Sequence, residues 1–199
     1  MAGNVTPGNL AMGPGDLYVA AFGAPEPLPQ QINGTPASSA WTAVGGTQGG
    51  ITLNTANTWK ELDVDQIVET PARRLTKREH SIKTNLAEVT FANYVIAMSG
   101  GTISSDAAPL GGGTAYDEYV DDDVNSGDEP DYKAVLFDGW GSYSGTGGLR
   151  RRVILRKCIN TDNVEIKADK DGQTVYAVTF NSHYVSSAIR SRRTIQARA

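Results

Sequence analysis

The stretch LTKREHSIKTNLAEV, residues 75–89, alternates between two kinds of side chain. His80, Ile82, Thr84 and Leu86 fall on one side of an extended chain, and charged or polar residues such as Lys83 fall on the other. Successive side chains of a β-strand point to opposite faces, so this period of two predicts a half-buried strand.

The preceding stretch WKELDVDQIV, residues 59–68, alternates in the same way, and Pro71 separates the two. Leu62, Val64 and Val68 form its predicted core face, opposite three carboxylates. Two alternating runs this close in sequence predict an antiparallel hairpin.

Further strands are predicted wherever short apolar runs lie between glycine, proline or asparagine residues. These runs are residues 16–22, 41–44, 51–54, 132–137, 149–159, 163–168 and 174–185, with the last two joined across Asp171-Gly172. The period changes once, where Phe91, Tyr94, Val95 and Met98 recur behind Thr90 as N-cap with Gly100 as the stop. That spacing predicts one short helix.

The predicted fold is mainly β: two packed antiparallel sheets, sandwich-like or barrel-like, with one short flanking α-helix. We expect one domain over residues 1–199. Residues 1–15 and 186–199 are predicted to be flexible terminal arms, and residues 99–131, rich in glycine and acid, a long irregular loop.

Composition limits the function. The formal net charge of −4 argues against a protein built to grip nucleic acid, whose phosphates call for Lys and Arg. Cys158, the single cysteine, is expected to be a small buried residue in a reducing environment. No run approaches the roughly 20 apolar residues of a membrane span, and residues 1–9 lack the features of a secretion signal. We expect a soluble protein without membrane contact.

The sequence shows no catalytic or metal-binding pattern. Asp121, Asp123 and Asn125 resemble the start of a calcium loop, but Ser126 and Tyr132 occupy places that need glycine and glutamate. His80 and His183 have no second ligand at metal spacing, and the glycine clusters match no phosphate-binding motif. We therefore expect a non-enzymatic protein with no cofactor and no metal.

Arg150, Arg151, Arg152, Arg156 and Lys157 form a concentrated basic patch. Alternation sends Arg150, Arg152 and Arg156 to the face opposite Val153 and Leu155. Three interpretations stay open: a solvated face, a surface that pairs with acidic residues of another subunit, or a contact with nucleic acid.

The order of features resembles the N-terminal half of the major tail-tube proteins of long-tailed, siphovirus-type bacteriophages. The segments that carry the resemblance are GPGDLYVA (13–20), WTAVG (41–45), GITLN (50–54), VDQ (64–66) and LAEVTF (86–91). It covers residues 13–98. The C-terminal half matches in kind, with an acidic loop followed by strands that end near Thr179-Phe180.

The resemblance implies two packed β-sheets with a flanking helix, and six copies that close into a ring. Stacked rings would form the virion tail tube, assembled in the host cytoplasm, through which viral DNA passes without specific binding. The implied partners are further copies of the chain and the tape-measure, tail-terminator and tail-tip proteins. A carbohydrate-binding or surface-binding β-sandwich is the alternative, suggested by Trp140 and Tyr143 among glycines.

Two sets of residues are predicted to act in such an assembly. The polar face of the hairpin is expected to line the channel, through Glu61, Asp63, Asp65, Glu79 and Lys83. The acidic loop is expected to meet a basic surface of a neighbour, through Asp121, Asp122, Asp123 and Asp128 on one side and Arg150, Arg152 and Arg156 on the other.

Overall fold

The computed structural model describes residues 10–11, 13–36, 40–108, 113–121, 129–144, 147–166 and 170–198. Its elements are β1 (Asp16–Ala21), η2 (Pro29–Gln31), β2 (Thr42–Ala43), β3 (Thr47–Leu62), β4 (Ala72–Leu86), α1 (Phe91–Met98), β5 (Thr102–Asp106), β6 (Tyr116–Val120), β7 (Lys133–Ser144), β8 (Gly147–Asn160), β9 (Tyr176–Ser182) and β10 (Arg192–Gln196). The predicted class, mainly β and antiparallel with one α-helix, is confirmed.

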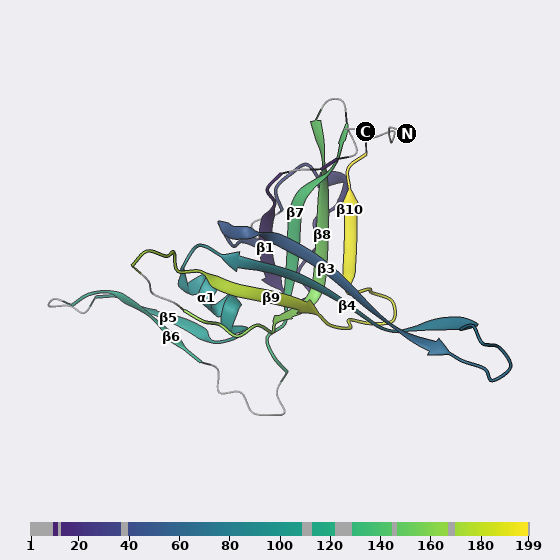
Figure 1. Cartoon of the computed structure of the whole chain (residues 1–199). Helices are drawn as coiled ribbons and strands as arrows, with labels where there is room; N and C mark the ends of the chain where they lie inside the picture. Colours follow the sequence, from purple (N-terminus) through teal and green to yellow (C-terminus); the bar gives the residue numbers. More distant parts are fainter. Residues whose placement is uncertain are drawn as a thin grey trace.

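Strand β8 organises the main sheet, whose order over the described residues is β2-β1-β7-β8-β9-β4-β3. One edge of β8 pairs with β7. The other edge pairs with β10 over Arg151–Leu155 and then with β9 over Cys158–Asn160. The sheet therefore divides along β8, and Figure 1 shows β9, β4 and β3 crossing over β1, β7, β8 and β10 as a second layer.

The main core fills the space between these layers. Leu17, Val135 and Leu155 come from the first layer and meet Ile82 and Phe180 from the second. Helix α1 adds Tyr94, Ile96 and Ala97 to the same cluster. The face predicted from residues 80–86 is thus the buried one at Ile82, Thr84 and Leu86.

A second core lies on the opposite face of the first layer. Leu136 and Ile154 are buried there together with Trp41, on the face that residues 22–36 cover. The indole of Trp41 donates a hydrogen bond to the Pro25 carbonyl at 2.9 Å, which holds that segment in place. Because both faces of β7 and β8 are covered, these strands contain runs of consecutive apolar residues instead of a strict alternation.

Helix α1 begins and ends close to the predicted residues. The Thr90 hydroxyl accepts a hydrogen bond from the backbone N–H of Asn93 at 3.2 Å, as the N-cap prediction requires. The helix ends at Met98, and its C-cap, Ser99, lies one residue before the predicted stop at Gly100 and adopts a φ of 60°. Over the described residues, no helix has the length and apolar character that crossing a bilayer needs.

Several predicted loops and strands are wrong in detail. The loop 99–131 contains the β5–β6 hairpin, and the Tyr119 ring packs edge-on against Tyr94 of α1 at 4.7 Å. Residues 163–166 form no strand because Asn160 bends the chain there: its side-chain oxygen accepts hydrogen bonds from the N–H groups of Asp162 and Thr179.

Both predicted terminal arms contain residues that pack against the body. Segment 186–199 contains β10, which pairs with β8. Of the predicted N-terminal arm, residues 1–9 and 12 lie outside the described residues. Gly13 and Gly15 lie so close to the Trp140 and Phe137 rings that a Cβ atom would clash with them.

The prediction that Arg152 belongs to a basic surface is wrong, because Arg152 is buried. Its side chain does lie opposite Val153 and Leu155, but residues 22–36 cover that face and leave Arg152 1% exposed. Its guanidinium donates to Asp138 Oδ2 at 2.6 Å and to the Gly34 carbonyl at 2.8 Å. Arg152 is therefore not available to a neighbouring subunit.

We predict that Arg152→Ala lowers the free energy of unfolding by about 3–5 kcal/mol, because it removes the buried guanidinium that binds Asp138 Oδ2 and leaves only Arg150, 3.7 Å from Oδ1, near the carboxylate. The exposed neighbour Arg151→Ala should change it by no more than about 0.5 kcal/mol. Asp138→Leu/Arg152→Met should recover part of the loss. Urea unfolding measures all three, and equal losses for Arg151→Ala and Arg152→Ala would contradict the assignment.

Cys158 is buried as predicted, and its thiol is expected to be inert in the native protein. Burial raises its pKa to about 12, so at pH 8 almost none of it is thiolate, the reactive form. A thiol reagent that releases a coloured product should react slowly with Cys158 in the folded protein and rapidly after urea is added. Equal rates in the two states would show that this part of the core opens readily.

Candidate assembly surfaces

Strands β3 and β4 extend beyond the body as a two-stranded ribbon (Figure 1). Strand β4 pairs with β9 only over Ser81–Leu86, whereas its pairing with β3 continues outward to Leu62 and Ala72. We call residues 56–79 the arm and residues 61–70 the tip. A two-stranded ribbon of this kind is marginally stable alone in water, so a partner surface would stabilise it.

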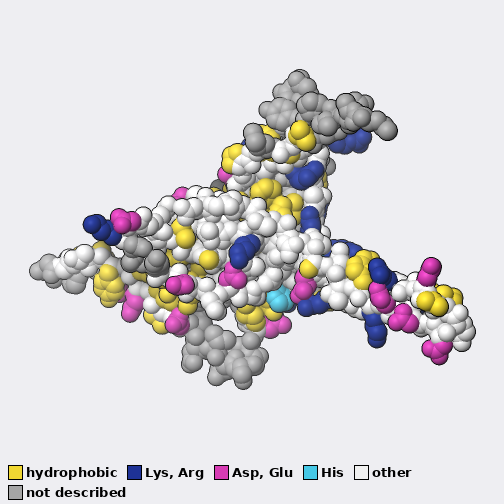
Figure 2. Space-filling view, in the orientation of Figure 1, with side chains coloured by type: hydrophobic (Ala, Val, Ile, Leu, Met, Phe, Trp, Pro, Cys, Tyr) yellow, Lys and Arg dark blue, Asp and Glu magenta, His cyan; other side chains and the backbone are white. Residues whose placement is uncertain are grey.

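The arm exposes apolar side chains. Trp59 is 55% exposed, Ile67 is 54% exposed and Val68 is fully exposed. The tip, ELDVDQIVET, also holds four carboxylates and no lysine or arginine. Figure 2 shows hydrophobic and acidic side chains together at the end of the arm. Contiguous exposed apolar residues beside polar ones are typical of interaction sites.

The predicted channel-lining residues do not share one face. Strand β3 ends at Leu62, so Asp63 and Asp65 lie in the turn of the tip. The extra residue at the bulge in the arm belongs to β4, so β3 alternates without a break and Glu61 faces the same side as Leu53. Glu79 and Lys83 face the other side. Glu61 also forms an ion pair with Arg73 at 2.6 Å.

The apolar residues of that stretch are also misplaced in the prediction. Val64 and Val68, expected to form a core face with Leu62, are exposed at the tip. The alternation is present in the sequence, but the body ends before it reaches Val64 and Val68, so no other described residue covers them.

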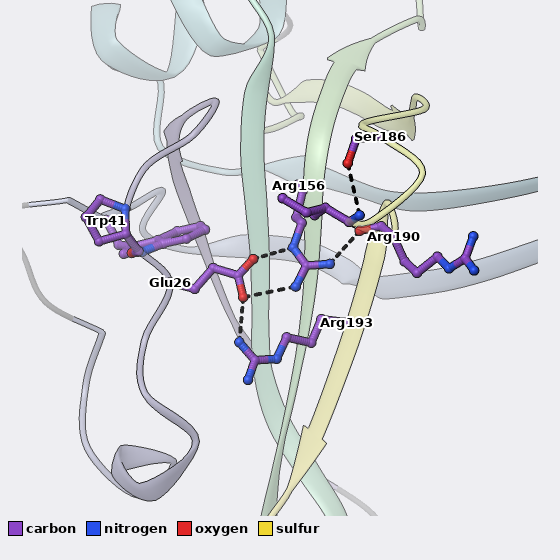
Figure 3. Close-up of polar contacts among 8 residues, drawn as sticks. Glu26, Trp41, Arg156, Ser186, Arg190 and Arg193 are labelled. Atoms are coloured by element: carbon purple, nitrogen blue, oxygen red, sulfur yellow. Dashed lines mark hydrogen bonds and ion pairs between the residues drawn. The ribbon is translucent and has the colours of Figure 1, made fainter.

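Arg156 belongs to an ion-pair cluster within the chain. Figure 3 shows Glu26 between Arg156 and Arg193, which bind its two carboxylate oxygens. Arg156 also donates to the Arg190 carbonyl. The cluster joins the segment 22–41, β8 and β10, so it fixes the C-terminal segment to the body.

Arg150 also has partners within the chain. Its guanidinium lies over the Trp140 ring at 4.8 Å and 3.7 Å from Asp138 Oδ1. Asp121 is exposed, and the other predicted acidic partners, Asp122, Asp123 and Asp128, lie outside the described residues. The predicted pairing of the acidic loop with a neighbour therefore stays a prediction, without Arg152.

A second basic group was missed as a site because its members are far apart in the sequence. Arg78 of β4, Arg190 and Arg192 line one pocket of about 480 Å³ at the base of the arm, together with Leu75, Tyr184 and Ile189. The sequence signal is the group of arginines in residues 190–198, which the sequence predicts to belong to a flexible C-terminal segment. We call this the basic pocket.

His80 also lines the basic pocket, and its environment favours the neutral ring. Burial lowers its pKa, and the charges of Arg192 and Arg78 lower it further. Its Nδ1 lies 3.0 Å from the Thr55 hydroxyl. In the described part of the chain, no three His, Cys, Asp or Glu side chains are grouped closely enough to hold a metal ion.

The chain matches no protein-family model, and no curated protein matches it.

We predict that Glu26→Gln destabilises the protein by about 2 kcal/mol at pH 7, because charge-assisted hydrogen bonds to two arginines are lost. Burial alone would raise the pKa of Glu26, but Arg156 and Arg193 together lower it below its ordinary value of 4.5. Its contribution is therefore complete above the unfolded-state pKa and is lost as pH falls through the lower native pKa.

Urea unfolding of the wild type and Glu26→Gln at pH 7 and near pH 3 tests this prediction. The difference between them should shrink at the lower pH. Glu165→Gln, which changes an exposed carboxylate, provides the matched control. A difference between wild type and Glu26→Gln that is independent of pH would contradict the assigned ion pairs.

Proposed function

We propose that this chain is a structural subunit, the major tail-tube protein of a long-tailed bacteriophage, which works by assembling with copies of itself. The observation that carries the proposal is the arm: a ribbon that leaves the body with exposed apolar residues at its end. An isolated subunit gains nothing from such a ribbon, whereas a neighbour can bury Trp59, Ile67 and Val68.

Sheet edges support the same proposal. Strand β3 is the last strand in the order of the main sheet, so its outer edge has no partner among the described strands. Unpaired N–H and C=O groups on an edge can extend the sheet into a second chain. The apolar arm and the open edge both favour polymerisation.

The proposed assembly is a virion tail tube of stacked six-membered rings, built in the host cytoplasm, with tape-measure, tail-terminator and tail-tip proteins as partners. The net charge of −4 suits a conduit for DNA, because strong contacts between basic side chains and phosphates would slow its passage, and an acidic protein forms few of them. The carbohydrate-binding alternative is less favoured, because Arg150 already lies over the Trp140 ring that would stack on a sugar; the side chain of Tyr143 lies outside the described part of the structure.

We predict that the purified chain forms rings or tubes that negative-stain electron microscopy resolves, and that Val64→Ser/Ile67→Ser/Val68→Ser prevents this. The triple variant removes apolar surface that the body does not use, so its circular dichroism should match that of the wild type. Leu28→Ser/Val89→Ser/Ile166→Ser removes similarly exposed residues outside the arm and is the matched control.

Sedimentation velocity over a concentration series provides the second readout. A wild type that stays monomeric at high concentration and moderate salt would overturn the proposed function. Assembly of the triple variant equal to that of the control would remove the arm from the interface.

A further inference from the structure

We infer that the basic pocket is the receptor for the tip of the arm of a second copy of this chain. The inference rests on the proposed self-assembly and adds the residues that meet. Three arginines of the pocket have no carboxylate partner in the described part of the chain: Arg78, Arg190 and Arg192. Arg78 donates to Asn57 and Arg192 to Thr55, both neutral side chains.

The basic pocket and the tip are complementary in charge, and both also expose apolar side chains. The basic pocket combines these arginines with the exposed apolar side chains of Tyr184 and Ile189. The tip combines Asp63, Asp65 and Glu69 with Val64, Ile67 and Val68. Arginine binds a carboxylate through two parallel hydrogen bonds, and apolar burial beside such pairs excludes the water that would screen them.

A tip cannot reach the pocket of its own chain. Leu75 and Arg78 of β4 line the pocket, and the strand runs away from Leu75 for three more residues, roughly 10 Å, to Ala72 before the tip begins. The pairing of β3 with β4 out to Leu62 and Ala72 keeps the ribbon extended over this distance. Figure 1 shows the arm leading outward from the side of the body where β10 lies. The occupant must therefore come from another molecule.

Different surfaces of the two molecules then meet, so each copy both gives a tip and receives one. Such a head-to-tail contact produces a closed ring or an open filament, according to the rotation between copies. The phosphates of a nucleic acid are the competing anion for the basic pocket. The tip is favoured because the pocket is also apolar and because the whole chain carries a charge of −4.

Charge reversal tests the contact. In Arg78→Glu/Arg190→Glu, the concentration needed for half-maximal assembly should rise roughly tenfold or more, because buried like charges now meet at the interface. Asp63→Lys/Asp65→Lys/Glu69→Lys should have the same effect. The chain that carries both sets should regain assembly, and so should an equal mixture of the two singly reversed chains, because opposite charges again face each other.

Arg198→Glu/Lys170→Glu is the matched control, because it makes the same charge change at exposed residues outside the pocket and should assemble like wild type. The readouts are sedimentation velocity, near-ultraviolet circular dichroism to check the fold, and binding of a labelled DNA duplex. If the wild type does not assemble, the proposed function fails.

If the wild type and Arg78→Glu/Arg190→Glu assemble equally well, the basic pocket does not receive the tip, although the proposed tube can still be correct. Loss of assembly in both single variants without restoration in the combined chain would also overturn the tip-to-pocket contact. So would a pocket variant that assembles normally but loses duplex binding, since the pocket would then serve nucleic acid.

Discussion

Strands β7 and β8 are buried on both faces, and the rest of the structure depends on this constraint. One face needs the second layer of β9, β4 and β3, and the other needs residues 22–36 and Trp41, among which η2 is the one regular element. A polar residue on either face must find its partner inside the protein. Arg152 does so through Asp138 and the Gly34 carbonyl, and Glu26 holds the covering segment to Arg156 and Arg193.

Alternation predicted the strands well, because it reports the local backbone. Ile82 and Leu86 are buried as expected, and the Thr90 cap begins the helix as expected. Alternation divides side chains between two faces but does not say what covers each face. Arg152 lies on the predicted side of β8, yet a segment more than a hundred residues away in sequence buries it. No local pattern contains that contact.

The same limit explains the tip and the C-terminal segment. Val64 and Val68 follow the period of a half-buried strand, but the part of the chain that the structure describes provides no layer to cover them. Arg190, Arg192 and Arg193 look solvated because they are basic, but Arg192 and Arg193 belong to β10 at an edge of the sheet, and Arg190 and Arg192 line the basic pocket. Both errors concern surfaces whose partner is distant in sequence or, on the proposed function, belongs to another molecule.

The charge of the tip also bears on which contact two copies can make. An apolar ribbon with an open edge would pair with its own kind, edge to edge, and give dimers or aggregates. Glu61 is paired with Arg73, but Asp63, Asp65 and Glu69 form no ion pair among the described residues. These three carboxylates oppose that pairing, because two tips side by side would bring like charges together where little water remains to screen them. A surface that offers both arginines and apolar side chains removes the repulsion and still buries the valines. Acidic residues at the end of an apolar arm thus disfavour symmetric pairing, and they leave head-to-tail contact, which can continue from copy to copy, as the favourable one.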